Sequence, residues 1–455
     1  MNYLIIGNSA AGLSAVKEII KNDSDGLITI ISQEKYPAYS RPAISYFLSG
    51  EMSEEQLFFP SLENKRITTM LGRKVKKIDF SSKKAILDND QSIPYGKLLI
   101  STGGVPIISL IKGIDHPEVY KFHTLDDAKE VIQKMNKKKK VIIIGSGLIG
   151  IRAAYALKKL GAQVTVIEIL NQILPAILDS QGAQIIENHL KFKGIQILTG
   201  KSIQEIVSFN NRSISHVLLN SGEKIDCDMV ICATGVKPNL NIFKNTDLMI
   251  NQGIIVDSYL QTNIPDVFAA GDVAECYDLI RDRYFINANW TNASIQGRIA
   301  GKNMTGLKEK YSGSMAMNSF VIEGIPCITM GITNPQSSPV SSLRSKDQKY
   351  HISTKINTHR KIYKKIVIDH NLIVGAIFVG EVKGAGIVNS IIRERIDISK
   401  IKNSILDERI VYIKFIKNKR KDVMEGKIKW QKQIGMTEPY HKRIDEKKWR
   451  KRAKK

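Results

Sequence analysis

Cysteine is scarce in this chain of 455 residues: there are only four, and no two of them form a CxxC pair. The eight histidines show no zinc-ligand spacing. So few thiols exclude a disulfide scaffold and suit a reducing cytoplasm. We therefore expect neither a metal nor an iron–sulfur cluster in the chain.

Long apolar runs are also missing. No stretch of about 18 apolar residues occurs, so we expect no membrane span. The first strand begins almost at the N-terminus, at Tyr3, with no charged segment and apolar leader before it, so we expect no secretion. These absences together predict a cytoplasmic protein.

Negative charge is in short supply, because 44 acidic residues face 68 Lys and Arg, giving a net charge of +24. Nearly half of this excess lies in a basic tail, residues 417–455, with 16 Lys and Arg against 5 Asp and Glu. We expect the tail to be partly disordered. A positive field favours an anionic partner: an acidic protein, a nucleic acid or a membrane surface.

The main feature that is present is a duplication. Residues 3–34 and 141–168 each run as apolar strand, glycine-rich turn, helix, second apolar strand and acid. Each half is later followed by an apolar strand and a Thr-Gly turn, at Thr102-Gly103 and Thr234-Gly235. Two copies of one nucleotide-binding plan predict an α/β fold with two Rossmann-like, three-layer dinucleotide-binding domains.

The first turn, Gly7-Asn8-Ser9-Ala10-Ala11-Gly12, is a GxGxxG motif with serine at the central glycine. Gly7 permits the tight turn, the small Ser9 lets a pyrophosphate approach the backbone, and Gly12 lets helix and strand pack closely. The helix N-terminus offers free N–H groups to the phosphates. Glu34 follows the next strand and can accept from ribose hydroxyls, although the preceding glutamine competes for that role. A purely structural tight turn is the alternative.

The second turn, Gly145-Ser146-Gly147-Leu148-Ile149-Gly150, keeps all three glycines. The strand that follows the next helix ends at Glu168, where a carboxylate can bind the adenosine ribose. Residues 169–172 include no Arg or Lys to pair with a 2′-phosphate, and the carboxylate would repel one. NADH is therefore favoured over NADPH.

A third motif, Val267-Phe268-Ala269-Ala270-Gly271-Asp272, completes the pattern. Together these motifs resemble the pyridine-nucleotide-dependent flavoprotein reductases, the glutathione-reductase-like superfamily. The resemblance implies that Asp272 hydrogen-bonds the ribityl chain of FAD, and that the turn at Gly271 brings backbone to the flavin phosphate. Because only the first glycine-rich turn is completed by this motif, that turn is assigned to FAD and the second to NADH.

Within the superfamily, residues 1–400 are most similar to NADH:rubredoxin reductases and to the flavin module of NADH-dependent nitrite reductases. The resemblance is carried by Tyr39-Ser40-Arg41-Pro42, Trp290–Met304, Met317-Asn318-Ser319-Phe320 and residues 374–380. It implies that Arg41 and Pro42 lie at the FAD pyrophosphate and isoalloxazine. It also implies that a helix over 291–304, with Trp290 and Asn292 at its start, points its N-terminus at the flavin N1–O2 edge.

A redox cysteine is absent where the family has one. Disulfide reductases and related NADH oxidases or peroxidases keep a cysteine after the Arg-Pro segment, whereas residues 44–50 hold none, so we expect no sulfur relay at the flavin. Cys227 and Cys232 form a CxxxxC. Residues five apart on one strand point to opposite faces, so we interpret this pair as structural.

A second departure concerns a Lys–Glu pair that related ferredoxin reductases carry near flavin N5. The matching positions here are Tyr46 and Arg152. We hypothesise that Arg152 is catalytic and lies near the nicotinamide–flavin junction. The alternative is that Arg152 points into a polar domain interface.

Short β-rich runs at 362–368 and 372–379 lead to a helix near 383–394, which indicates a third, smaller α+β domain. The predicted domains are an FAD-binding domain in two segments (1–113 and 245–318), an NAD-binding domain (114–244), a C-terminal interface domain (319–416) and the basic tail (417–455). By the resemblance, a homodimer through the C-terminal domain is an open possibility.

The predicted function is to pass electrons from NADH via FAD to a one-electron carrier, either an acidic rubredoxin or ferredoxin or an iron–sulfur subunit of a larger anaerobic redox system. The cofactors carry the hydride transfer, and no general acid–base residue is needed. One alternative is an NADH oxidase or peroxidase acting on oxygen species. Another is a nucleic-acid-binding or scaffold role for the tail, where Trp430, Tyr440 and Trp449 interleave with Lys and Arg. A nucleic-acid partner is the least favoured.

Overall fold

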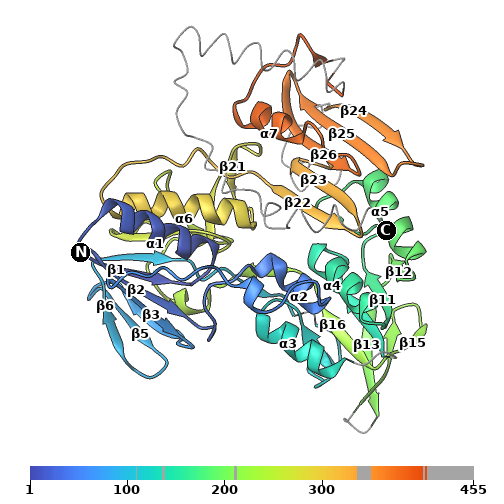
Figure 1. Ribbon diagram of the computed structural model, residues 1–455, viewed down its shortest axis with the longest axis horizontal. Helices are drawn as coiled ribbons and strands as arrows, with labels where there is room; N and C mark the ends of the chain where they lie inside the picture. The colour runs from blue at the N-terminus through green and yellow to red at the C-terminus, as the bar shows by residue number, and fades with distance from the viewer. Residues whose placement is uncertain (109, 136–138, 210–212, 336–349, 403–404, 407–455) are drawn as a thin grey trace, which may run out of the picture.

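The computed structural model describes residues 1–108, 110–135, 139–209, 213–335, 350–402 and 405–406. Two five-stranded parallel sheets and one five-stranded antiparallel sheet organise these residues (Figure 1). The predicted α/β class, with two Rossmann-like units and a smaller C-terminal unit, is confirmed. The predicted basic tail lies outside the described residues.

The first unit is built on a parallel sheet with the strand order β19-β7-β1-β2-β3. Its strands are β1 (Asn2–Ile6), β2 (Leu27–Ser32), β3 (Ile67–Leu71), β7 (Lys97–Ile100) and β19 (Val267–Ala269). Helices α1 (Ala10–Asn22) and α6 (Trp290–Met304) lie side by side over this sheet (Figure 1). Since β19 and α6 follow the second unit in the chain, the first unit is assembled from two separate segments.

Helices α1 and α6 approach backbone to backbone because α6 carries two glycines at the contact. A Cβ added at Gly297 would lie 2.0 Å from the carbonyl oxygen of Ala11, and one at Gly301 would lie 2.5 Å from that of Ala15. Both pairs advance along the two helices in the same direction. The helices are therefore parallel, and both N-termini face the same end of the sheet.

The second unit repeats the plan of the first, with the strand order β12-β11-β10-β16-β9. Its strands are β9 (Val119–Lys121), β10 (Lys140–Ile144), β11 (Gln163–Glu168), β12 (Gln196–Thr199) and β16 (Met229–Cys232), and its helices are α3 (Leu125–Lys134), α4 (Leu148–Lys159) and α5 (Ser180–Phe192). β1, α1 and β2 of the first unit correspond to β10, α4 and β11.

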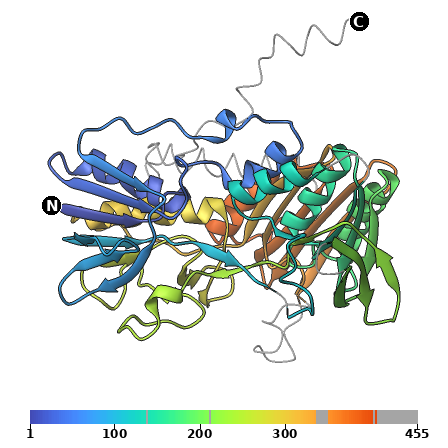
Figure 2. The same ribbon diagram turned by 90° about the horizontal axis from the view of Figure 1, so that it is seen from below.

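A pair of short strands and a helix lie where the units meet. The short strands β8 (Gly104–Pro106) and β17 (Val236–Pro238) pair antiparallel where the chain enters and leaves the second unit. Helix α2 (Ile44–Leu48), from the first half of the chain, packs against α3 and α4. Figure 2 shows the first unit on the left and the second on the right.

Three small sheets and three short helical turns complete the two units. The sheets are β4 (Val75–Asp79), β5 (Lys84–Leu87) and β6 (Ser92–Pro94); β13 (Ile203–Phe209), β14 (Ser213–Leu219) and β15 (Lys224–Asp226); and β18 (Ile254–Ile255), β20 (Ala274–Asp278) and β21 (Arg283–Phe285). The turns are Arg41–Ala43, Glu55–Leu57 and Asn241–Phe243.

The C-terminal unit is the antiparallel sheet β22-β23-β26-β25-β24 with helix α7. Its elements are β22 (Met317–Ile322), β23 (Ile325–Gly331), β24 (His351–Asn357), β25 (Ile362–Asp369), β26 (Leu372–Val379) and α7 (Ala385–Arg393). The two strands and the helix predicted in this region are confirmed. Within the described residues, no helix combines the length and the apolar character that a bilayer crossing needs.

Candidate functional site

Both glycine-rich turns begin at a glycine that no other residue can replace without strain. Gly7 has φ +115° and Gly145 has φ +96°, in the region that L side chains rarely adopt. A Cβ on Gly7 would lie 2.1 Å from the carbonyl oxygen of Ser101, and one on Gly145 would lie 2.6 Å from that of Ala233. The backbone of each turn is therefore held against the neighbouring strand end.

The last glycine of each turn permits close packing, as the sequence predicts. A Cβ on Gly12 would lie 2.0 Å from the carbonyl oxygen of Gly7, and one on Gly150 would lie 2.1 Å from that of Gly145. At the middle position the second turn is open, since a Cβ on Gly147 would meet no atom within 4 Å. This open space lies at the N-terminus of α4, where a pyrophosphate fits.

The two Thr-Gly turns connect the units. The Thr102 hydroxyl donates to the carbonyl oxygen of Asn239 at 3.2 Å, and the Thr234 hydroxyl donates to that of Ile107 at 2.7 Å. Each turn thus binds the chain that runs the other way through the β8–β17 connection. Both threonines hold the β8–β17 connection together, and their assignment to cofactors, with Gly103 and Gly235, stays a prediction.

The Asp272 carboxylate can accept a hydrogen bond from a ligand. Burial raises the pKa of its carboxyl group, and the nearby Arg41 guanidinium partly opposes that rise. Among the described residues, none donates a hydrogen bond to this carboxylate. The turn before it is fixed, because the Gly271 N–H donates to Oε1 of Gln296 at 2.7 Å. A ribityl hydroxyl of FAD fits such an acceptor.

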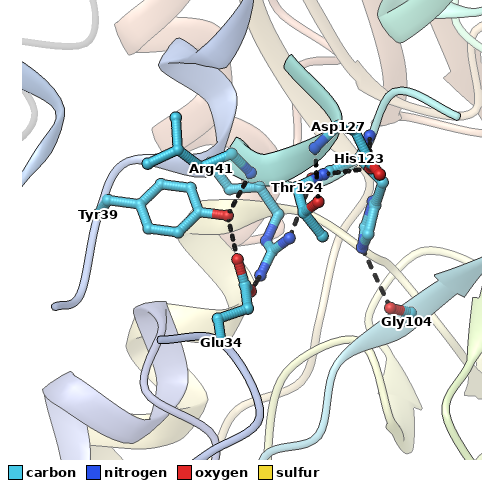
Figure 3. A network of polar contacts seen from close by, with 8 residues as sticks. Glu34, Tyr39, Arg41, Gly104, His123, Thr124 and Asp127 are labelled. Atoms are coloured by element: carbon cyan, nitrogen blue, oxygen red, sulfur yellow. Dashed lines mark hydrogen bonds and ion pairs between the residues drawn. The ribbon is translucent and has the colours of Figure 1, made fainter. Parts of the chain in front are cut away.

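Glu34 lies in a polar network that crosses from the first unit to the second (Figure 3). Its carboxylate accepts from the Tyr39 hydroxyl at 2.5 Å and forms a salt bridge with Arg41. Arg41 also donates to the carbonyl oxygen of His123 at 2.9 Å, and the Leu125 N–H donates to the Tyr39 hydroxyl at 3.1 Å. A carboxylate offers about four lone-pair sites, so two acceptor positions remain for ribose hydroxyls.

Glu168 is held by its own turn instead. It is 6% exposed, and one oxygen accepts from both the backbone N–H of Ser146 at 2.8 Å and the Ser146 hydroxyl at 2.7 Å. Its other oxygen accepts from the Leu170 N–H at 3.0 Å. Sequence reasoning missed Ser146, although it lies inside the motif, because its position in GxGxxG is formally free.

Arg152 and Tyr46 meet at the boundary of the two units. The Arg152 guanidinium donates to the Tyr46 hydroxyl at 2.6 Å and to the carbonyl oxygen of Pro42 at 3.1 Å, and it lies 4.7 Å from the centre of the Tyr46 ring. The two positions matched to the family's Lys–Glu pair are thus in contact. The contact brings a cation to the Arg-Pro segment; a catalytic role for Arg152 stays a prediction.

The start of α6 is strongly fixed. The Trp290 ring packs against Phe59 with 5.8 Å between ring centres. Asn292 is 2% exposed, and its side-chain amide donates to the carbonyl oxygens of Asn287 at 3.1 Å and Met315 at 3.0 Å. The Asn292 side chain therefore anchors the helix start, and contact of Trp290 and Asn292 with FAD stays a prediction.

All four cysteines are buried free thiols: Cys227, Cys232, Cys276 and Cys327. Burial raises the pKa of Cys227 to about 12 and that of Cys232 to about 11, so both are neutral. The structural interpretation of the pair holds, but its reason was wrong. Cys227 precedes β16, which starts at Met229, and both thiols lie in one apolar cluster rather than on opposite faces.

Comparison with known proteins matches two family models to the chain. The pyridine nucleotide-disulphide oxidoreductase model matches residues 1–297, and the rubredoxin NAD+ reductase C-terminal domain model matches residues 317–396. Both glycine-rich turns lie within the first match, and the antiparallel C-terminal sheet lies within the second.

Individual relatives agree with these matches. The nitrite reductase [NAD(P)H] of Bacillus subtilis is 30% identical over 87% of this chain, which spans only 48% of that relative's length. An NADH oxidase of Methanocaldococcus jannaschii is 33% identical over 68% of this chain and 71% of its own. The crystal structure of NADH:rubredoxin oxidoreductase from Clostridium acetobutylicum superposes with a TM-score of 0.71 at 27% identity, covering 90% of this chain and 98% of that one. The chain belongs to the pyridine nucleotide-disulphide oxidoreductase family.

Proposed function

We propose that this chain passes electrons from NADH through FAD to a small iron–sulfur carrier protein. The observation that carries the proposal is the composition of the segment beside the second unit. Pro42 and Tyr46 contact Arg152 there, and residues 44–50 contain no thiol. The four cysteines are buried in cores. The chain therefore offers no disulfide that a bound FAD could reduce, so its electrons would pass to an external acceptor.

Family membership gives FAD and NADH as the cofactors. FAD, when bound, supplies the hydride acceptor and can release electrons singly. We assign the first turn, Glu34, Arg41 and Asp272 to FAD, since Asp272 lies near the Arg41 guanidinium and accepts no hydrogen bond from the residues that the structure describes. The second turn and Glu168 would hold NADH, because the open helix N-terminus favours a pyrophosphate and the fixed carboxylate favours a ribose without a 2′-phosphate.

The role of the remaining residues is to position the two cofactors. The Arg152–Tyr46 contact joins α4, which follows the NADH turn, to α2, which follows the Arg-Pro segment. It therefore fixes the second unit relative to the first at the point where the resemblance places the nicotinamide and the flavin. Holding reacting groups in one geometry is a large part of what an enzyme contributes to hydride transfer.

The finer parts of the proposal concern the partner and the assembly. A net charge of +24 favours an acidic rubredoxin or ferredoxin, or an iron–sulfur subunit of a larger redox system. The domain boundaries 1–113, 114–244, 245–318 and 319–416 are proposed to separate the FAD-binding segments, the NAD-binding domain and an interface domain. That interface domain would support a homodimer.

A second candidate is an NADH oxidase acting on oxygen, which the relative from Methanocaldococcus jannaschii favours. The missing cysteine near the flavin favours the carrier instead. The test is NADH oxidation by the purified holoenzyme with oxygen alone, then with an acidic rubredoxin and an acidic ferredoxin, at 20 to about 500 mM salt, a range over which long-range charge attraction is progressively screened. Carrier reduction that is fast and falls with salt supports the proposal. Equally fast turnover with oxygen alone overturns it.

A further inference from the structure

The network around Glu34 connects the predicted FAD ribose acid to the other unit of the molecule. We propose that Tyr39 is a positioning residue whose hydroxyl couples the seating of the second unit to retention of FAD in the first. This inference rests on the proposed placement of FAD at Glu34 and Arg41. No ligand needs to contact Tyr39 for it to act.

The coupling runs through one hydroxyl group. The Tyr39 side chain is only 5% exposed, and its hydroxyl donates to Glu34 at 2.5 Å while it accepts from the Leu125 N–H at 3.1 Å. Leu125 is the first residue of α3, in the second unit. The hydroxyl therefore bonds one group from each unit, and a shift of α3 away from the first unit removes the acceptor of the first N–H of α3.

A second path in the same hydrogen-bond network runs through Arg41. Its guanidinium joins the Glu34 carboxylate to the carbonyl oxygen of His123 at 2.9 Å. The His123 ring in turn lies 3.2 Å from the carbonyl oxygen of Gly104, at the start of the connecting strand β8. Figure 3 shows these groups pointing toward one another from both units. Both residues assigned to FAD in this region are thus oriented by the segment 123–125.

Hydrogen bonds fix the segment 123–125, as a positioning role requires. Thr124 caps α3: its hydroxyl accepts from the Asp127 N–H at 3.1 Å, and the Asp127 carboxylate accepts from the backbone N–H groups of His123 at 2.8 Å and Thr124 at 2.7 Å. This reciprocal capping box satisfies N–H groups that a helix start otherwise leaves free. Asp127 therefore controls the geometry of the segment without touching Glu34.

The chain also offers a matched control. Tyr36 crosses the same boundary, with its hydroxyl 2.5 Å from the Asp126 carboxylate, but that contact is exposed and leads to no residue assigned to FAD. Tyr36→Phe and Tyr39→Phe each remove one hydroxyl that joins the units. They differ in burial and in the connection to Glu34.

The experiment measures release of FAD from the diluted holoenzyme by the rise in flavin fluorescence. Tyr39→Phe should accelerate release about tenfold, since it leaves a buried amide and a carboxylate oxygen unpaired. Tyr36→Phe should stay within about twofold of the parent, as exposed contacts contribute little. A release rate unchanged by Tyr39→Phe would overturn the coupling.

A double-variant cycle separates coupling from a merely structural role. Asp127→Ala should also accelerate FAD release, and its effect should be smaller in the Tyr39→Phe background, because both changes break the path through Tyr39. The part of the effect that remains runs through His123 and Arg41. Additive effects contradict the proposal. If Asp127→Ala does not fold, Thr124→Ala replaces it.

Glu34→Gln tests the underlying placement of FAD. Release that Glu34→Gln leaves unchanged would overturn the placement together with the coupling. Release that accelerates in Glu34→Gln but not in Tyr39→Phe would overturn the coupling alone.

Discussion

The two glycine-rich turns share one plan but hold their acids in different ways. Glu168 is fixed by Ser146 of its own turn, whereas Glu34 makes no hydrogen bond to its own turn among the described residues and is fixed by Tyr39 and Arg41. The acid of the second turn is thus held within its own unit. The first depends on a segment of the neighbouring unit.

This difference matches the demands on the two cofactors that we propose for these turns. A nicotinamide cofactor must enter and leave in every turnover, so a site whose acid is preset locally binds without rearranging the rest of the molecule. A flavin stays bound, and under the proposed placement of FAD at Glu34 the packing of the neighbouring unit would support its retention. The two turns thus differ in what supports the acid: Ser146 lies inside the second turn, whereas Tyr39 and Arg41 lie outside the first.

The largest effect is expected when the last glycine of one turn, Gly12 or Gly150, is replaced by alanine. In Gly12→Ala the new Cβ meets the carbonyl oxygen of Gly7 at 2.0 Å, and in Gly150→Ala it meets that of Gly145 at 2.1 Å. Backbone atoms cannot move aside as a side chain can, so each change should lower the affinity for the cofactor assigned to that turn about 100-fold. Gly12→Ala should purify without flavin. Gly150→Ala should remain yellow with a raised KM for NADH, and loss of flavin from Gly150→Ala would contradict the division of labour.

The next effect concerns the contact between the units. Arg152→Ala should slow hydride transfer about tenfold, measured as flavin bleaching after rapid mixing with NADH, because the nicotinamide and flavin are then less well aligned. Tyr46→Phe, which keeps the ring under the guanidinium, should cost less. An unchanged rate in Arg152→Ala with intact NADH affinity would show that Arg152 serves only the polar interface.

The sequence predicted the parts whose signals are local. The helix expected over 291–304 is α6 from Trp290 to Met304, and both turns have the expected strand before and helix after. The turns were predicted from glycine spacing between an apolar strand and a helix, and the helix from the residues that carry the family resemblance. Both signals lie in neighbouring residues along the chain. The contact of Tyr46 with Arg152 was accessible only through resemblance, since 106 residues separate them.

The parts that escaped prediction depend on contacts between distant segments. Tyr39 and Leu125 are 86 residues apart, and no pattern in the sequence pairs a tyrosine hydroxyl with a helix N–H. The cysteine argument failed for a related reason. Strand alternation applies only inside a strand, and the chain leaves the extended conformation between Cys227 and Met229.

A smaller effect should distinguish the two acids by their local support. Ser146→Ala removes one of three hydrogen bonds to Glu168, so the KM for NADH should rise about fivefold with kcat unchanged. Asn8 occupies the same position in the first turn, and no hydrogen bond joins it to Glu34 among the described residues. Asn8→Ala should leave FAD release unchanged. Faster release in Asn8→Ala would show that the first acid is also supported by its own turn.

The smallest expected effect is a pH dependence in the first network alone. Burial and the neighbouring Arg41 lower the pKa of His123 to about 4, from about 6.5 when unfolded. The unfolded chain therefore takes up a proton on acidification before the folded chain does, and stability falls as pH drops below 6.5. Between pH 7 and 6 this amounts to about 0.7 kcal/mol. Thermal unfolding of the holoenzyme at both pH values measures this difference in stability. The difference should disappear in His123→Gln, whose side-chain amide still offers a donor to the carbonyl oxygen of Gly104. In the described residues no histidine contacts Glu168, so the second network should add no such pH dependence. If His123→Gln responds to pH as the parent does, the titrating group lies elsewhere, and this contrast between the two networks is wrong.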